Sequence, residues 1–479
     1  MKLRAWQQVA IDRALEQYCA GIAHNLTVAA PAAGKTTMAS VLAQRLFELD
    51  MIDYVVCLVP SRPVKVSFRH ALERHTGHRM DGQLIARGTV ITYQSLAHCD
   101  PSFWPLLAQY RVLMIYDEIH HCAGGQGISG NTWGDALLEE IEQCASYTLA
   151  LSGTPWRSDA IPVATLPYCS VQGEVEPSFV YGLAQAIDDN VCRSPRLILV
   201  DNTGIRVTQH ANNRTDRYAA IQEFVHQSVL PYQSLLNQRS LLLHMLTKAN
   251  HQLHQIRKKT PDAAGLVVAS SIAHAESIAQ LIRQKMKQDC VLVNSKMPHA
   301  TKSLEGFEKG TSPWLVSVGM VSEGTDIPRL QVCCHLTHIK TELHFRQVLG
   351  RILRFRNIGD DLCYMYLLAD QQLSVFAHRL AEDLPKDNAV VNLLPFPDDV
   401  SSQTPVAMDE DSPLHELTPS GESEPLGAPE ITVGESDFDG GYGGVENGDV
   451  GGPKNTNTLS IFGRYWESLV ALQTSKNIA

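Results

Sequence analysis

Two kinds of apolar pattern alternate along the first 370 residues of the chain. Short uninterrupted apolar runs, such as Val55–Val59 and Val112–Tyr116, are separated by longer stretches in which apolar residues recur every three or four positions. A run without a polar face predicts a strand buried on both sides, and the longer spacing predicts an amphipathic helix. This alternation is typical of parallel sheets covered by helices on both faces. The pattern therefore predicts an α/β fold.

Two later segments show a helical period of their own. A polar and apolar repeat between Asn212 and Lys259 predicts a helical insertion. Near the end of the chain, apolar residues fall along one helical face after Thr458 or Ser460, either of which can cap a helix. The positions on that face are Leu459, Phe462, Trp466, Leu469, Val470 and Gln473. We expect a short terminal helix that either docks a partner protein or packs back on the rest of the chain.

A chain of 479 residues is long enough for two or three domains. We expect a first domain at 1–190 and a second at 191–380, with the helical insertion at about 212–259 inside the second. An acidic linker at 381–456 and the short helix at 457–479 would follow.

A phosphate-binding loop is predicted at Ala29–Thr36, which follows the apolar strand candidate Leu26–Val28. Such a loop needs a strand end, a turn of small residues and a helix start, because backbone N–H groups and a lysine hold the phosphates. Gly34 and Lys35 fit these roles, Thr36 is placed to hold Mg²⁺, and Thr37, which follows it, is also expected to bind the nucleotide. The sequence departs from G-x-x-x-x-G-K-[ST] only at Ala29. The expected helix has its apolar residues at Met38, Val41, Leu42, Leu46 and Leu49.

Paired carboxylates follow the apolar run that ends at Tyr116. Asp117 is suited to hold Mg²⁺, and Glu118 is suited to orient and deprotonate an attacking water. A solvated acidic turn is the plain alternative. The segment His120–Cys122, and histidines scattered over the helical insertion, could also suggest zinc, but no second ligand pair has a suitable spacing.

A second set of residues that could act on the same phosphates lies more than 200 residues later. Gln347, Arg351 and Arg354 match Q-x-x-G-R-x-x-R and would fall on one face of a helix. Arginines in such a position can stabilise the charge of a phosphoryl group in transfer. A basic surface helix is the alternative for this string taken alone.

Taken together and in this order, the motifs resemble those of superfamily 2 helicases of the DExH type. The resemblance covers roughly residues 1–370. It implies that Gln7 contacts adenine and that Asp326 belongs to the nucleotide site. It also implies that Ser152 and Thr154 couple ATP to the nucleic acid. The segments that resemble backbone-gripping motifs contain Thr92 and Ser270.

Within that superfamily the chain is similar to type III restriction motors and to phage and bacterial branched-DNA helicases. The resemblance implies two RecA-like domains with ATP and Mg²⁺ between them, and it favours DNA over RNA as the partner. We expect an ATP-dependent DNA helicase or translocase. A motor subunit of a larger restriction, defence or repair complex and an ATP-switched nucleic-acid sensor remain open as alternatives.

The net charge of −11 is distributed unevenly. Residues 381–453 hold 17 acidic residues and one lysine, a local net charge of −16, so the remainder of the chain stands at +5. The acidic segment is rich in Pro, Gly and Ser, which predicts disorder. It can act as a solvated spacer or compete with nucleic acid for a basic groove.

The 11 cysteines form no C-x-x-C pair, which indicates reduced thiols. No apolar run approaches the length of a membrane span, and the amino end leads directly into a motif without a cleavable signal. We therefore expect a cytoplasmic protein without a membrane partner.

Overall fold

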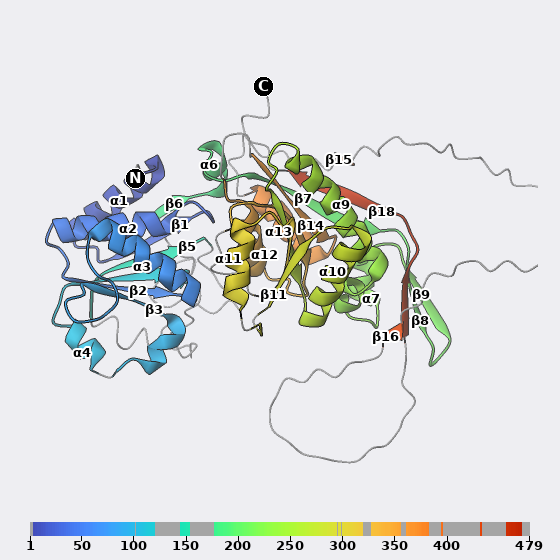
Figure 1. Ribbon diagram of the computed structural model, residues 1–479, viewed down its shortest axis with the longest axis horizontal. Coiled ribbons are helices and arrows are strands. Elements are labelled where there is room, and N and C mark those ends of the chain that lie inside the picture. Colours follow the sequence, from blue (N-terminus) through green and yellow to red (C-terminus); the bar gives the residue numbers. More distant parts are fainter. Residues whose placement is uncertain are drawn as a thin grey trace, which may run out of the picture.

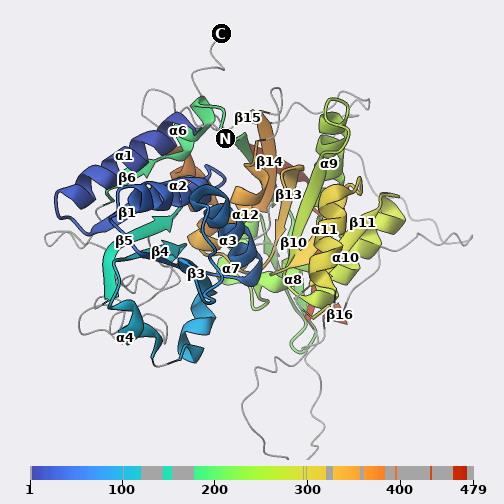
Figure 2. The same cartoon turned by 60° about the vertical axis from the view of Figure 1, so that its left-hand side comes forward.

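The computed structural model describes residues 3–100, 102–119, 144–153, 177–294, 296–297, 299–319, 327–355, 361–382, 394–395, 432–433 and 457–471. These residues form two α/β lobes that lie side by side, with the amino-terminal lobe on the left of Figure 1. Figure 2 shows the helix α12 (Glu342–Ile352) of the second lobe beside the first lobe.

The first lobe is built on a parallel sheet with the strand order β3-β2-β4-β5-β1-β6. Its strands are β1 (His24–Ala29), β2 (Tyr54–Val59), β3 (Gly88–Thr92), β4 (Val112–Asp117), β5 (Ala145–Ser152) and β6 (Phe179–Tyr181). Its helices are α1 (Ala5–Cys19), α2 (Lys35–Glu48), α3 (Arg62–Thr76), η1 (Tyr93–His98), α4 (Phe103–Leu107) and α6 (Leu183–Asp188).

Strand β4 illustrates why the apolar runs are strands. All six of its residues are buried, with Leu113 and Ile115 in the core under α1, α2 and α3 and Met114 and Tyr116 in the core under α4. Successive side chains of a strand point to opposite faces, so a sheet covered on both sides requires apolar residues at every position.

The second lobe has the strand order β11-β12-β10-β13-β14-β7-β18-β15, in which the strands from β11 to β7 are parallel. Its strands are β7 (Ser194–Asn202), β10 (Ala264–Ala269), β11 (Cys290–Asn294), β12 (Trp314–Val318), β13 (Leu330–Leu336), β14 (Leu362–Leu368), β15 (Leu394–Pro395) and β18 (Tyr465–Ala471). Its helices are α7 (Ile221–Gln227), α8 (Tyr232–Leu236), α9 (Arg239–Arg257), α10 (Ile272–Lys285), α11 (Ala300–Lys309), α12 (Glu342–Ile352) and α13 (Gln371–Glu382). Two parallel-sheet domains are thus confirmed.

A small antiparallel sheet extends from the second lobe in the order β16-β17-β8-β9. Its strands are β8 (Ile205–Gln209), β9 (Arg214–Tyr218), β16 (Thr432–Val433) and β17 (Asn457–Ile461). The expected helical insertion is therefore wrong at its start, because Arg214–Tyr218 pairs with β8 as a strand. The remainder forms α7, α8 and α9, whose apolar residues belong to the core of the second lobe.

The expected helix at 457–479 is wrong, because β17 and β18 occupy the described part of that segment. β18 pairs antiparallel with β7, and β17 with β8, so the segment forms a second ribbon beside the β7–β8 ribbon (Figure 1). Both ribbons bend at glycines: a Cβ on Gly463 would lie 2.0 Å from the amide nitrogen of Gly204. Leu459, Leu469 and Val470 are buried in the lobe, so the segment packs back on the rest of the chain.

The predicted acidic linker at 381–456 lies outside the described residues except at its first two residues and at two short strands. β15 pairs with β18, and β16 pairs with β17. At these four residues the chain forms paired strands, so the predicted disorder is wrong there.

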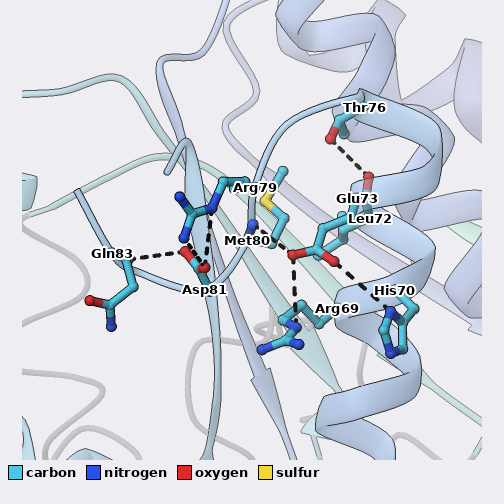
Figure 3. Close-up of polar contacts among 9 residues, drawn as sticks. All are labelled: Arg69, His70, Leu72, Glu73, Thr76, Arg79, Met80, Asp81 and Gln83. Atoms are coloured by element: carbon cyan, nitrogen blue, oxygen red, sulfur yellow. Dashed lines mark hydrogen bonds and ion pairs between the residues drawn. The ribbon is translucent and has the colours of Figure 1, made fainter. Parts of the chain in front are cut away.

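An exposed loop precedes β3 at its amino end (Figure 3). The Asp81 carboxylate accepts hydrogen bonds from the Arg79 side chain at 2.6 Å and from the Gln83 amide, and the Glu73 carboxylate accepts one from the Met80 amide. These bonds fix a turn whose tip, Leu84 and Ile85, is 87% and 88% exposed.

Replacing Ile85 with asparagine is expected to raise the free energy of unfolding by about 1 kcal/mol. Ile85 has a φ of +74°, which crowds a β-branched side chain, whereas asparagine tolerates this conformation. Leu84→Asn is the matched control, since Leu84 is equally exposed but does not have a positive φ. Urea unfolding of both variants measures the effect, and an equal change in the two would contradict the assignment of strain to Ile85.

Candidate nucleotide site

The carboxyl ends of the parallel strands place the predicted first-lobe residues along one edge of the sheet. The phosphate-binding loop follows β1, Thr92 ends β3, Asp117 ends β4 and Ser152 ends β5. In open α/β sheets this edge is where ligands bind. The described part of the first lobe thus brings these side chains, far apart in the sequence, to one side of the domain.

The loop between β1 and α2 has the backbone that a phosphate cradle requires. Ala32 and Gly34 have φ values of +64° and +97°, and Gly34 is the residue that precedes the first turn of α2. A Cβ on Gly34 would lie 2.8 Å from Nε2 of Gln7, and the φ of +97° would strain any other residue, so the position favours glycine. Ala29, where the motif has glycine, is the last residue of β1 and pairs with Tyr181, so this position is ordinary extended strand.

Lys35 and Glu118 form the central contact of the site. The Lys35 ammonium lies 3.1 Å from Oε1 of Glu118, and their side chains are 11% and 29% exposed. The ammonium also lies 3.4 Å from the Ala29 carbonyl. Glu118 has a φ of +53°, a conformation that is rare outside glycine and is found at functional sites.

Asp117 is buried at the end of β4, beside Glu118. Its backbone carbonyl accepts a hydrogen bond of 2.9 Å from the buried hydroxyl of Tyr93. Tyr93 thus contacts the backbone at the end of β4, a contact that the sequence did not reveal because the two residues lie 24 positions apart. The donor set suits Mg²⁺: a buried carboxylate next to a threonine-bearing loop supplies hard oxygen ligands. Thr36, at the start of α2, is the expected hydroxyl ligand.

Gln7 lies in α1, buried against the loop. Its Nε2 donates to the Gly34 carbonyl at 2.9 Å, and its Oε1 accepts from the Arg4 amide. The Arg4 guanidinium donates to the Ala33 carbonyl at 2.6 Å. Arg4 therefore holds the loop together with Gln7, although sequence reasoning had assigned only Gln7. The neighbouring Trp6 stacks on Tyr181, with ring centroids 4.8 Å apart.

Gly153 is another residue of this site that sequence reasoning did not assign. A Cβ on it would lie 3.4 Å from both the Ala29 carbonyl oxygen and the Lys35 ammonium nitrogen. The segment after β5 therefore approaches the phosphate-binding loop through its backbone. Ser152, directly before it, is fully buried.

The second lobe reaches this loop through α12, which carries Gln347 and Arg351. Gly350 packs directly on the loop: a Cβ there would lie 2.8 Å from Cβ of Pro31. Arg354 lies beyond the end of α12, which is Ile352, so the expectation that all three residues share one helical face is wrong for Arg354. Burial lowers the pKa of Arg354 to about 10, which still leaves it charged at neutral pH.

The residues predicted to contact nucleic acid lie in different parts of the two lobes. Thr92 shares a hydrogen bond of 2.8 Å with Ser95. Ser270 follows β10 in the second lobe, where its hydroxyl contacts Gln233 and His274. Thr154 and Asp326 lie outside the described residues. Among the described residues, no group of three His, Cys, Asp or Glu side chains could hold a metal ion, and no helix is long and apolar enough to cross a membrane.

Two family models match the chain. The res subunit of type III restriction enzymes matches residues 1–157, and the helicase conserved C-terminal domain matches residues 246–356. The first match covers the phosphate-binding loop and the paired carboxylates, and the second ends two residues after Arg354.

Curated relatives include uncharacterized proteins of Mycobacterium tuberculosis and Mycobacterium leprae. The first is 32% identical over 376 residues, and the second is 31% identical over 373. Each match covers 75% of this chain and 60% of the relative, so the chain spans less than two thirds of their length.

Solved structures with this fold include proteins of restriction systems. The type ISP restriction-modification enzyme LlaBIII bound to DNA has a TM-score of 0.53 at 14% identity, covering 80% of this chain and 30% of that one. A fragment described as the HsdR subunit of a type I restriction enzyme from Vibrio vulnificus has a TM-score of 0.52 at 18% identity, covering 78% and 65%. The amino-terminal part of the chain matches the model of the type III restriction res subunit, a later part matches that of a helicase C-terminal domain, and the solved structures share the two-lobed fold. The chain is thus similar to superfamily 2 helicases and to type III restriction motors.

Proposed function

We propose that the protein is an ATP-dependent DNA translocase or helicase with ATP bound between its two lobes. The observation that carries this proposal is the approach of α12 to the phosphate-binding loop, where Gly350 packs on Pro31. A nucleotide held by Lys35 in one lobe would there meet Arg351 from the other. Binding and hydrolysis of ATP would then change the position of one lobe relative to the other.

Each residue of the site has a chemical role in this proposal. Lys35 neutralises phosphate charge, and Thr36 and Asp117 hold Mg²⁺, which when bound stabilises the negative charge of the β- and γ-phosphates. Glu118 orients the attacking water and accepts its proton. Lys35 is paired with Glu118 in this structure. Bound phosphates would replace Glu118 as the partner of Lys35, and the Glu118 carboxylate could then bind the attacking water.

Directed movement follows if each lobe grips the strand with a different affinity in the two states. Thr92, on the first lobe, and Ser270, on the second, are the proposed contacts to the nucleic acid backbone. We favour DNA because the first family model is that of a restriction enzyme subunit and because the structure of LlaBIII, which shares this fold, is bound to DNA.

A motor subunit within a larger assembly is the second candidate. It is supported by the type ISP enzyme, in which the matched region makes up 30% of the chain. Such a subunit would turn over ATP on DNA but separate no strands by itself.

Steady-state ATP hydrolysis tests the proposal, measured without nucleic acid and then with single-stranded DNA, duplex DNA, forked DNA or RNA. We expect one DNA form to increase the rate of ATP hydrolysis at least about tenfold, because DNA that binds both lobes favours their closed arrangement. A strand-displacement assay on the same substrates separates a helicase from a subunit that only translocates. Hydrolysis that is indifferent to every nucleic acid would contradict the motor and favour a partner-dependent or sensor role.

A further inference from the structure

Arg193 lies where the chain enters the second lobe, immediately before β7, and its side chain is completely buried. Its guanidinium donates three hydrogen bonds to backbone carbonyls: to Leu330 at 2.7 Å, to Ile352 at 2.9 Å and to Pro328 at 2.8 Å. Its amide donates a fourth, to the Leu353 carbonyl at 2.8 Å. A single residue of the linker between the lobes is thus bonded to two separate segments of the second lobe.

Both segments adjoin residues proposed to act on ATP. Ile352 and Leu353 form the end of α12, between Arg351 and Arg354. Pro328 and Leu330 follow shortly after Asp326 in the sequence. The last carbonyls of a helix lack partners within the helix and carry partial negative charge. A buried guanidinium satisfies them and fixes their direction more rigidly than water would.

The preceding residue, Cys192, faces the first lobe. Burial raises the pKa of its thiol to about 12, and the protonated thiol donates to the Pro31 carbonyl of the phosphate-binding loop at 3.2 Å. Cys192 also forms an isolated antiparallel bridge with Arg354. Cys192 and Arg193 therefore connect the loop that would hold the phosphates to the two arginines that would reach them.

We propose that Arg193 is a positioning residue for ATP hydrolysis, which it serves by holding the end of α12 so that Arg351 and Arg354 reach the γ-phosphate. This inference rests on the proposed function. Arg193 itself contacts backbone rather than nucleotide, so its contribution is geometric. A displacement of a charged group by about 1 Å can cost roughly a hundredfold in rate, because transition-state stabilisation depends steeply on placement.

Arg329 offers a matched control in the same lobe. It is also buried, at 3% exposed, and its guanidinium donates to the carbonyls of Phe307, Ser312 and Asp262. These carbonyls belong to the end of α11 and to the segments that precede β12 and β10, all within the second lobe. Arg193→Met and Arg329→Met therefore remove the same kind of side chain and similar hydrogen bonds. Arg329 lies between Pro328 and Leu330, but of the bonds named here only those of Arg193 reach the end of α12.

The experiment compares both variants with wild type in thermal unfolding, in DNA-stimulated turnover and in nucleotide affinity. Affinity is measured for ADP and for ADP with aluminium fluoride, a mimic of the phosphoryl group in transfer. We expect similar losses of thermal stability in the two variants. Arg193→Met should lower kcat by about ten- to a hundredfold and abolish the tightening of ADP binding by aluminium fluoride, with ADP affinity unchanged. Arg329→Met should keep both properties within about threefold of wild type at a temperature where it is folded.

Equal losses of kcat in the two variants would overturn the inference. So would an Arg193→Met variant whose affinity for ADP is still increased by aluminium fluoride. Should Arg193→Met not fold, Arg193→Lys carries the same comparison, with an intermediate loss expected because an ammonium reaches fewer carbonyls than a guanidinium. A wild-type protein that neither binds ADP nor hydrolyses ATP would overturn the proposed function and this inference together. An active wild type with a normal Arg193→Met variant would overturn the inference alone.

Discussion

Replacing Lys35 with alanine is expected to lower ATP turnover by about a hundred- to a thousandfold while the protein stays folded. The ammonium lies at the start of α2 beside the loop that would hold the phosphates, 3.1 Å from Glu118. Without it, nothing at this position neutralises the phosphate charge, so ATP should also bind more weakly. The partly exposed Lys35–Glu118 pair contributes little to stability, and thermal unfolding should change only slightly.

Glu118→Gln should stop turnover equally but should not weaken ATP binding. The amide cannot accept a proton from the attacking water, whereas removing its charge also removes repulsion toward the phosphates and leaves Lys35 free to bind them. The two variants are thus distinguished by the dissociation constant for ATP, measured by equilibrium binding beside turnover. Lys248→Ala is a suitable control, since Lys248 pairs with a glutamate, Glu467, at 3.3 Å on the second lobe. Substantial turnover in Lys35→Ala or Glu118→Gln would mean that the site is wrongly assigned.

Removing residues 457–479 is expected to unfold or severely destabilise the second lobe. The deletion takes away the partner of β7 along seven paired positions and exposes the surface covered by Leu459, Leu469 and Val470. Burying a large apolar side chain contributes about 1.5–3 kcal/mol, so three of them represent much of the roughly 5–15 kcal/mol that stabilises a typical domain. An uncovered β7 would also present an unpaired edge for aggregation.

Solubility, thermal unfolding and hydrogen exchange of the β7 amides measure this effect. The control converts the carboxylates within 396–431 to amides, which keeps the length of the chain and leaves β17 and β18 intact. A truncated protein as stable as wild type would contradict the role given to β18. The control also tests whether the acidic segment competes with DNA: the amide variant should then bind DNA more tightly, most clearly at low salt. Deleting everything beyond residue 384 could not test this, since it would remove β18 as well.

The nucleotide site could be predicted because its determinants are local. A strand end, a turn of small residues and a helix start are contiguous at Ala29–Thr36. Asp117 and Glu118 directly follow a strand whose uninterrupted apolar residues indicate that it is buried. The parallel sheet then brings these strand ends to one edge without further specification. The family resemblance added Gln7, which the structure places against the loop at Gly34.

The predicted C-terminal helix is wrong because the spacing of the apolar residues in this segment is compatible with two structures. Apolar residues at Leu459, Phe462, Trp466 and Leu469 are spaced as on a helix, yet they are also compatible with a bent strand. The decision came from β7 and β8, which offer unpaired edges to β18 and β17, and pairing across an edge outweighs the weak helical preference of a short segment.

By itself, the sequence determined the α/β fold, the phosphate-binding loop and the paired carboxylates, because each depends on residues that are neighbours in the chain. Only the tertiary structure decided that residues 457–471 complete the second lobe and that Arg193 supports the end of α12. Arg193 bonds to carbonyls 137 and 159 residues away. Such contacts leave no periodic or local trace in the sequence, since they depend on where distant segments meet after the sheets have formed.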